Sequence, residues 1–574
     1  MARSAIESVL AIDIGELTTR VLLYEQVDGG FLAVARGEAP TTAGIPELGV
    51  MPGVLEALKV VETAAGKVFI IPQGNIQAAP NLVDAVVVTL AAGADIRTVC
   101  VSLTTDISLE SVIRLACSSD TAVVASLARG DGRPLQEQMD AVLHSSPELI
   151  IIGGGTEHGK AGQAGDLLNA LRMALALLPR DKRPEVLYAG SSALEEKTRH
   201  TIGTQAPVIV TANIQPQVDQ ESLDPARTIL MGMTARLKSR RVTGMQSLVD
   251  QTGGEVTLRT TSFGRMIRYL GSVYQSARGV LGVDMGITHL TLAGARAGQL
   301  WQGRYLYPAA QQEISSDSMQ QLLSWLTEPV YPEKAAECWL QRDIYPGAIP
   351  ELSDEVAVDL SLARLRIQQA MQQYQQMYPV LQLSTDSGLT PGWEPIILSG
   401  EWPARWLSPA QAVHLLLDAL QPTGITNLVL DSGNLLSLLG ACGQVAPNLP
   451  VDLLEAGLLQ HLGTVVAPVC LRAGVSRWME LSMQPEGGEE VRVTVYAGNL
   501  FNLPLDEGQS ARLTLIPEPQ IQLGRKLNHG ELTLKVTGSA LGVIIDARGR
   551  KIQLPAGALE RQKLLKKWQS SLIR

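Results

Sequence analysis

The chain has 574 residues, of which 45% are hydrophobic and 18% charged, and this length predicts roughly three to four domains. Its formal net charge is −10 with no block of basic residues, which excludes nucleic acid as the main partner. No apolar run reaches the ~18–20 residues of a membrane-spanning helix, and the five scattered cysteines are typical of free thiols in the cytoplasm.

The N-terminal segment predicts a strand meander with a tight turn after an aspartate. Apolar runs at 9–14 and 19–24 flank this turn, and Asp13 and Gly15 stand where the first run ends. A carboxylate there can hold hydrated Mg²⁺, and glycine lets backbone N–H groups reach a phosphate oxygen. Such a segment is also a common simple turn. The candidate Mg²⁺ and phosphate ligands are Asp13, Gly15, Thr18 and Thr19.

From about residue 50 to 230, strand-like runs alternate with helical stretches, which favours parallel α/β units. One run, 150–152, leads into a glycine-rich loop. Glycine N–H groups near a helix start can bind an anion, although a tight strand-to-helix turn explains the pattern equally well. Glu157 and His158 are candidate acid–base groups, but such a pair is more often solvated. The candidate anion ligands are Gly153, Gly154, Gly155 and Thr156.

A second hairpin of the same kind opens the second half of the chain. The apolar run 280–283 is followed by Asp284, Gly286 and Thr288. We expect Asp284 to hold Mg²⁺, directly or through water, and Gly286 and Thr288 to contact phosphate. His289 comes next without evident metal-binding partners, so we interpret it as structural. Two such hairpins, each opening an α/β region, favour phosphate binding more than either does alone.

The C-terminal part has a different pattern. Strand-like runs separated by turns predict an all-β barrel or sandwich over residues 469–558. Residues 559–574 predict a basic amphipathic helix with Leu565 and Trp568 on its apolar face. This helix can contact an acidic membrane or a partner, or pack on the β-domain.

The chain resembles the glutamate mutase L-type proteins, a branch of the actin-like ATPase superfamily, over roughly residues 8–445. The long and unusual stretch 417–426 weighs most in this resemblance. The other segments that carry it are 11–15, 18–20, 152–157, 187–190, 212–216, 282–286 and 345–350.

This resemblance implies two ribonuclease-H-like lobes with an inserted α/β region, and the all-β domain expected from the strand pattern follows them. The expected boundaries are a first lobe with the insertion at 1–240, a crossover at 241–275 and a second lobe at 276–468. The family's members are regarded as ATP-dependent chaperones or reactivation partners of adenosylcobalamin-dependent mutases. The resemblance therefore implies ATP and Mg²⁺ as ligands, no bound cobalamin, haem or zinc, such a mutase as partner, a homo-oligomer as an option, and a cytoplasmic location.

Two departures from the family pattern weaken the nucleotide interpretation. Ile287 replaces the second glycine of the hairpin, and Gly400 is the single glycine where a Gly-Gly pair for adenosine is expected. One lost contact of this kind costs about 1–3 kcal/mol, or roughly 5- to 150-fold in affinity. Two functions stay open: an ATP-dependent chaperone, and a non-catalytic pseudo-ATPase scaffold or self-assembling protein. A small-molecule kinase is a third class. The sequence names no catalytic residue for ATP hydrolysis.

Overall fold

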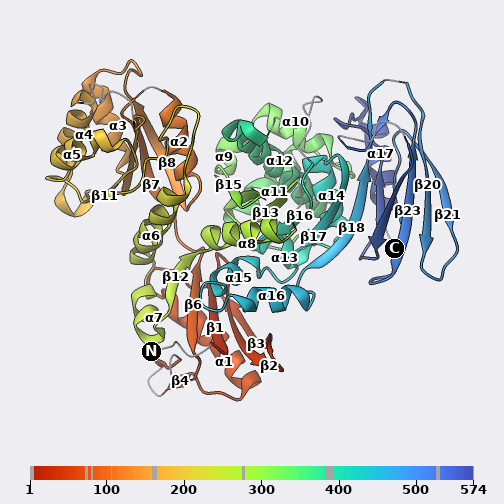
Figure 1. The fold of residues 1–574 in the computed structure, drawn as a ribbon, viewed down its shortest axis with the longest axis horizontal. Helices are drawn as coiled ribbons and strands as arrows, with labels where there is room; N and C mark the ends of the chain where they lie inside the picture. The colour runs from red at the N-terminus through yellow and green to blue at the C-terminus, as the bar shows by residue number, and fades with distance from the viewer. Residues whose placement is uncertain are drawn as a thin grey trace. The chain divides into compact units, whose positions relative to one another are not determined.

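A computed structural model describes residues 6–71, 75–78, 82–104, 106–157, 165–274, 278–381, 392–472, 474–524 and 530–572. The chain divides into two compact units, and each is described by itself. The first comprises Met1–Arg265, Gln302–Arg304 and Ser437–Leu453. The second comprises Met266–Trp301, Tyr305–Leu436 and Leu454–Arg574. Both combine helices with sheets, so the protein is a mixed α/β structure (Figure 1).

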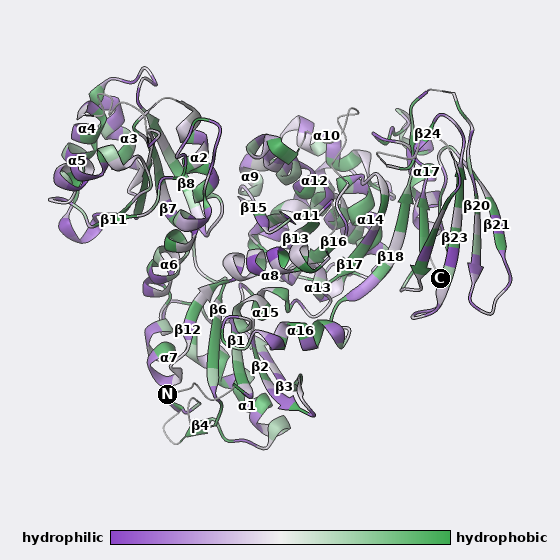
Figure 2. Cartoon of the chain, in the orientation of Figure 1, coloured by the Kyte–Doolittle hydropathy of each residue, from purple (hydrophilic) through white to green (hydrophobic). Residues whose placement is uncertain are grey.

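The first unit opens with a five-stranded sheet of order β12-β6-β1-β2-β3. Strands β1, β2 and β3 form the expected antiparallel meander, and β6 and β12 continue the sheet in parallel. All residues of β1 after Ser8 are buried, and the inner strands are largely hydrophobic (Figure 2). The strands are β1 Ser8–Ile14, β2 Thr18–Val27, β3 Gly30–Pro40, β6 Ala85–Leu90 and β12 Glu255–Leu258, with α1 at Met51–Ala65 and the short pair β4 Ile70–Ile71 and β5 Asn75–Ile76.

The segment expected to cross over between lobes, 241–275, contains regular structure in its described residues. It holds α7 (Met245–Thr252), strand β12 and helix α8 (Arg259–Val273). Strand β12 pairs in parallel with β6, so this part of the segment completes the first sheet. Its four residues, Glu-Val-Thr-Leu, alternate polar and apolar side chains and are mostly not buried, so the sequence alone does not distinguish this edge strand from a polar linker.

The region from Ile96 to Val210 forms a second sheet within the first unit. Its five strands run parallel in the order β11-β10-β9-β7-β8, as the alternating pattern predicts. Side chains from α3, α4 and α5 pack on one face, and those from α2 and α6 pack on the other. The elements are β7 Ile96–Ser102, α2 Asp106–Ala116, β8 Thr121–Ala128, α3 Leu135–Ser145, β9 Leu149–Gly153, α4 Gly165–Leu177, β10 Glu185–Tyr188, α5 Ser192–Ile202, β11 Val208–Val210 and α6 Asp224–Arg241.

The second unit contains an eight-stranded sheet of order β15-β14-β13-β16-β17-β18-β26-β22. Its first five strands repeat the order of the first sheet: β14 pairs antiparallel with β13, and β16 and β17 run parallel to β13. Helices α12 and α14 contribute to the core against it. These elements are β13 Val280–Met285, β14 His289–Arg296, β15 Gln299–Leu306, β16 Ile396–Ser399, β17 Gly424–Leu430, β18 Gln460–Ala467, β22 Leu500–Leu503, β26 Val543–Asp546, α12 Ser353–Met377 and α14 Pro409–Leu420.

The C-terminal strands divide between two sheets. Strands β22 and β26 extend the eight-stranded sheet beyond β18, while a four-stranded sheet of order β21-β20-β23-β25 packs against them through a shared core. Helix α17 (Ala558–Ser570) buries Leu565 and Trp568 in the core of the second unit. The remaining elements are β19 Val469–Cys470, β20 Arg477–Pro485, β21 Val491–Tyr496, β23 Ser510–Pro517, β24 Ile521–Gln522, β25 Leu532–Thr537, α9 Ala310–Glu313, α10 Ser316–Ser324, α11 Pro332–Ile344, α13 Glu401–Trp406, α15 Leu436–Cys442 and α16 Asn448–Glu455.

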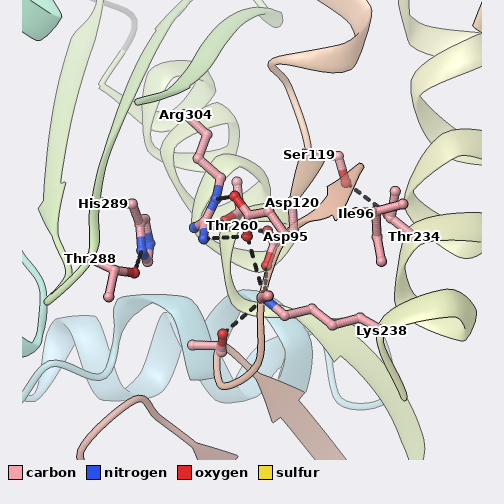
Figure 3. A network of polar contacts seen from close by, with 12 residues as sticks. Asp95, Ile96, Ser119, Asp120, Thr234, Lys238, Thr260, Thr288, His289 and Arg304 are labelled. Atoms are coloured by element: carbon pink, nitrogen blue, oxygen red, sulfur yellow. Dashed lines mark hydrogen bonds and ion pairs between the residues drawn. The ribbon is translucent and has the colours of Figure 1, made fainter. Parts of the chain in front are cut away.

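A buried network of charges lies in the first unit near the start of the parallel sheet (Figure 3). Lys238 on α6 is 0% exposed, and its Nζ lies 2.6 Å from Oδ2 of Asp120. Arg304 binds Asp95 through Nε and Nη2 at 2.9 and 2.8 Å. Two cations and two carboxylates balance, which is the condition under which charges tolerate burial.

Candidate nucleotide site

The first hairpin places its candidate residues on two faces of the sheet. Asp13 is paired with Arg20 across β1 and β2, and Ile14 with Thr19. Because successive side chains of a strand point to opposite faces, Asp13 and Thr19 lie on opposite sides. The Thr19 hydroxyl lies 3.1 Å from that of Thr41, and the N–H of Gly15 donates to the carbonyl of Thr18 at 3.0 Å. Only part of the predicted ligand set therefore shares the face of Asp13.

The carboxylate of Asp13 is fully engaged by three side chains. Thr89 donates to Oδ1 at 2.6 Å. Arg20 and Arg259 each donate through Nη1 to Oδ2, at 2.9 and 3.1 Å. Asp13, Arg20 and Arg259 are all buried, with exposed fractions of 1, 4 and 5%. We call this group the Asp13 clamp.

The Asp13 clamp does not fit a magnesium ion. A bound divalent cation needs carboxylate oxygens that face it or its water shell, and here both oxygens already accept hydrogen bonds. Two guanidinium groups beside Oδ2 repel a further cation in a buried site, where charges are weakly screened. Asp13 is therefore an ion-pairing residue in this structure, and we derive no metal chemistry from it.

The glycine-rich loop follows β9 in the parallel sheet, which is a different sheet from the one that holds Asp13. Gly154 has φ +119°, and a Cβ on it would lie 2.8 Å from the backbone nitrogen of Leu103. The N–H of Gly155 donates to Thr104 Oγ1 at 3.3 Å, and its carbonyl accepts from Asn213 at 2.9 Å. These contacts tie strand ends together, which matches the tight-turn alternative.

Neighbouring residues of this loop also have structural contacts. The carboxylate of Glu157 accepts from the Ser192 hydroxyl at 2.6 Å and from Asn213 Nδ2 at 2.8 Å. It thereby holds the first turn of α5. Gly153 ends β9, Thr156 is partly exposed, and His158 lies outside the described residues.

The second hairpin, in the second unit, is capped by a histidine ring. The N–H of Gly286 donates to the carbonyl of His289 at 2.9 Å. A Cβ built on Gly286 would lie 2.7 Å from Cε1 of His289, so the imidazole covers this glycine. Thr288 Oγ1 lies 3.5 Å from the same ring (Figure 3). The ring thus occupies the space through which a phosphate would approach Gly286.

Two further candidates flank this hairpin within the second unit. Asp284 is 1% exposed and is paired in register with Thr291 on β14 and Ser399 on β16. Gly400 follows β16 with φ +118°, and a Cβ there would lie 2.1 Å from the carbonyl oxygen of Met285. Only glycine permits this approach. The structure therefore brings Asp284, Gly286, Thr288 and Gly400 together.

A cavity of about 350 Å³ adjoins the second hairpin. Its walls come from the turn at 285–288, from residues 307–309, from α12 and from Trp402 on α13. The guanidinium of Arg366 stacks on Tyr307, with Cζ 4.1 Å from the ring centroid. Stacked cations and aromatic rings are surfaces on which a planar base can rest.

One acid of this cavity has a strongly altered pKa. Burial raises the pKa of Asp359 to about 6, against the opposing effect of Arg342. Arg342 Nε donates to Asp359 Oδ1 at 2.8 Å. The cavity thus contains a carboxyl group that titrates near neutral pH beside two arginines, Arg342 and Arg366.

Sequence reasoning missed these lining residues. Asp359 and Arg366 stand seven positions apart on α12, which places them on one face of a helix that is otherwise apolar there. Charged residues that interrupt an apolar helix at this spacing are the signal that could have found them. Trp402 and Tyr307 had no such signal, because their positions depend on tertiary packing.

A family model described as MutL protein matches residues 9–458. The chain belongs to the MutL protein family. This is the glutamate mutase L family that the motifs resemble, so that expectation is confirmed. No curated protein matches the chain.

Solved structures give only loose likenesses to this MutL-family chain. A nucleotide-free acetone carboxylase is 13% identical, and the match covers 86% of this chain and 81% of the carboxylase chain with a TM-score of 0.34. A nucleotide-free diol dehydratase-reactivating factor is 11% identical, and the match covers 77% of this chain and 100% of the factor with a TM-score of 0.31. A glycerol dehydratase reactivase is 10% identical, and the match covers 78% of this chain and 99% of the reactivase with a TM-score of 0.28. At these TM-scores the likenesses transfer no site.

Within the described ranges, no three His, Cys, Asp or Glu side chains gather as a metal site requires. None of the helices in the part of the chain that the structure describes combines the length and hydropathy needed to cross a bilayer.

Proposed function

We propose that this MutL-family protein is an actin-like partner of an adenosylcobalamin-dependent mutase. In this proposal the protein binds a nucleotide but does not hydrolyse it, because Asp13 holds no catalytic metal ion. The family supports the class of partner. The Asp13 clamp supports the absence of metal-dependent hydrolysis, and it is the observation on which the proposal depends.

The two sheets that share one strand order are the proposed actin-like lobes. Each begins with a meander whose first strand ends in Asp-x-Gly and continues with two parallel strands. In this interpretation, the parallel sheet over Ile96–Val210 is an insertion in the first lobe, and the C-terminal strands are an addition to the second. The domain boundaries given by the sequence remain a proposal.

The second unit is the proposed place of nucleotide binding. The Arg366–Tyr307 stack and Trp402 offer surfaces for a base, and Arg342 offers positive charge for phosphates. About 350 Å³ lies within the range of small-ligand pockets. The ring of His289 over Gly286 weakens the phosphate end of such a site.

Calorimetric titration of the full-length protein with adenosine, ADP and ATP, with and without Mg²⁺, tests this proposal. We expect ADP and ATP to bind with affinities that Mg²⁺ leaves unchanged, and no phosphate release on prolonged incubation. The variant Arg366→Met should weaken all three ligands, because it removes the stacking cation. Mg²⁺-dependent binding with phosphate release would overturn the proposal, and so would the absence of any nucleotide binding.

The partner is tested separately, by size-exclusion chromatography of the protein with a purified adenosylcobalamin-dependent mutase from the same source. A complex whose stability depends on ADP or ATP supports a nucleotide-gated partner, since gating requires different affinities in the two states. The second candidate, an ATP-hydrolysing chaperone, is favoured by the retained Asp284 and Gly286 of the second hairpin. Phosphate release on mixing with the mutase would establish it.

A further inference from the structure

A second and larger cavity lies in the second unit, away from the nucleotide hairpin. Its volume is about 480 Å³, and it lies among the segment that follows α10, helices α12 and α14, and the C-terminal helix α17. Apolar side chains form much of its wall: Trp325, Val356, Ala357, Leu360, Ala410, Leu565 and Trp568. A pocket of this size and lining is typical of small-molecule sites.

A buried arginine with incomplete hydrogen bonding lines this cavity. Arg364 is 7% exposed, and its Nη2 lies 3.0 Å from Oδ2 of Asp418. Its guanidinium stacks on Trp325, with Cζ 4.5 Å from the ring centroid. Among the described residues, Nε and Nη1 of Arg364 have no hydrogen-bond partner, although both atoms are buried. Buried polar groups nearly always find partners, so these two donors call for an acceptor.

The other charged groups at this end of the cavity are already paired. Arg548 binds both oxygens of Asp546 and also Asp418 Oδ1, at 2.6–2.9 Å. Asp418 thus divides its two oxygens between Arg548 and Arg364. Arg550 also pairs with Asp546, so two carboxylates face three guanidinium groups, which leaves one excess positive charge at the inner end. Arg364 is the group with free donors.

The acidic residues of the lining do not compete for these donors. Glu351 is exposed, and Glu328 pairs with Lys566 on α17 at 3.1 Å. His414 contributes a buried Nε2 that has no hydrogen-bond partner in the described part of the chain. The cavity therefore combines an apolar body with one cationic, under-bonded end.

We propose that this cavity binds a small organic acid, with its carboxylate on Arg364 and its apolar body between Trp325 and the α17 residues Leu565 and Trp568. A carboxylate supplies the acceptors that Nε and Nη1 lack, and a charge-assisted bond to a buried guanidinium is among the stronger polar contacts. Because α17 forms one wall, the bound acid also holds this helix against the core.

The probe is 3-phenylpropionate, and 3-phenylpropan-1-ol is its uncharged match of similar shape. Calorimetric titration of the full-length protein should show the acid binding at least about tenfold more tightly than the alcohol, which corresponds to about 1.4 kcal/mol. Arg364→Met should remove this preference. Arg296→Met is the control, because Arg296 also stacks on a tryptophan, Trp301, but does not line the cavity.

A second variant tests the cavity without altering the buried Arg364, whose substitution could disturb folding. Ala410 lines the cavity and is partly exposed, so Ala410→Trp fills the space from its edge and should abolish binding of both probes. Equal affinity for acid and alcohol, unchanged binding by Ala410→Trp, or no saturable binding at millimolar concentration would each overturn the proposal.

Discussion

Nη1 of Arg259 lies 3.1 Å from Oδ2 of Asp13, although 246 residues separate them in the sequence. Arg259 is the first residue of α8 and directly follows β12, which joins the sheet that contains Asp13. Because the chain returns to this sheet through β12, the guanidinium of Arg259 lies beside Asp13, the residue expected to hold Mg²⁺. The ion pair explains how an aspartate in a nucleotide-type hairpin can be structural.

The first prediction concerns Asp13→Asn. The variant keeps the shape of the side chain but leaves Arg20 and Arg259 without their buried carboxylate, so it should lose about 3–5 kcal/mol of unfolding free energy. Its affinity for ATP should stay the same with and without Mg²⁺. Urea unfolding and calorimetry measure the two effects, and the exposed Glu56→Gln is the control. Lost Mg²⁺-dependent binding with unchanged stability would show a metal ligand instead.

The buried network of Asp95, Asp120, Lys238 and Arg304 predicts a pH-dependent effect. Lys238→Met should lower the unfolding free energy by about 3–5 kcal/mol near pH 7, because it leaves buried carboxylates under-compensated. Burial raises the pKa of Asp120, but Arg304 and Lys238 outweigh it, so the pKa lies below its ordinary 3.8.

A carboxyl group with a lowered pKa stabilises the fold above its unfolded value and loses this effect as the pH falls. The difference between wild type and Lys238→Met should therefore be constant from about pH 5 to 8 and shrink below about pH 4. Chemical unfolding across this range measures it, with the exposed Lys182→Met as control. A difference that grows in acid would contradict the assignment.

Asp359 predicts the opposite slope. Burial raises its folded pKa to about 6, above the ordinary 3.8, so the fold holds a proton that the unfolded chain releases. Its ionisation therefore destabilises the fold as the pH rises from about 4 to 6. Relative to wild type, Asp359→Asn should gain up to about 3 kcal/mol of unfolding free energy between pH 4 and pH 8. Thermal and urea unfolding at several pH values test this, and a pH-independent difference would refute it.

The sequence predicts sheets better than it predicts side-chain partners. The first meander and the second hairpin follow from local signals, namely apolar runs of strand length around Asp-x-Gly turns, and the structure has both. The pair Asp13–Arg20 is also local, because a short hairpin fixes its register. Arg259 reaches Asp13 only after the chain returns through β12, and Trp402 reaches its cavity through tertiary packing. Contacts of this kind leave no periodic signal in the sequence.

An alanine at position 400 should destabilise the fold through a steric clash. The same substitution at Gly298, which also has a positive φ, measures the cost of backbone strain alone. Gly400→Ala places a Cβ 2.1 Å from the carbonyl oxygen of Met285 at φ +118°, so it should cost at least about 2 kcal/mol of unfolding free energy. Gly298→Ala, at φ +78° with open space around the Cβ, should cost only about 1 kcal/mol. Urea unfolding of both variants measures the difference. Equal losses would mean that the turn after β16 relaxes away from the hairpin.

The last prediction tests the histidine that covers the second hairpin. His289→Ser should uncover Gly286, because Cε1 of the imidazole lies only 2.7 Å from the position of a Cβ built on Gly286. A phosphate oxygen could then approach the turn more closely, and ADP should bind about tenfold more tightly, or about 1.4 kcal/mol. Adenosine has no phosphate, so its affinity should stay the same and serves as the internal control. Calorimetry with both ligands separates the outcomes: a parallel change for adenosine and ADP would indicate a general rearrangement, and no change for either would place the phosphates elsewhere.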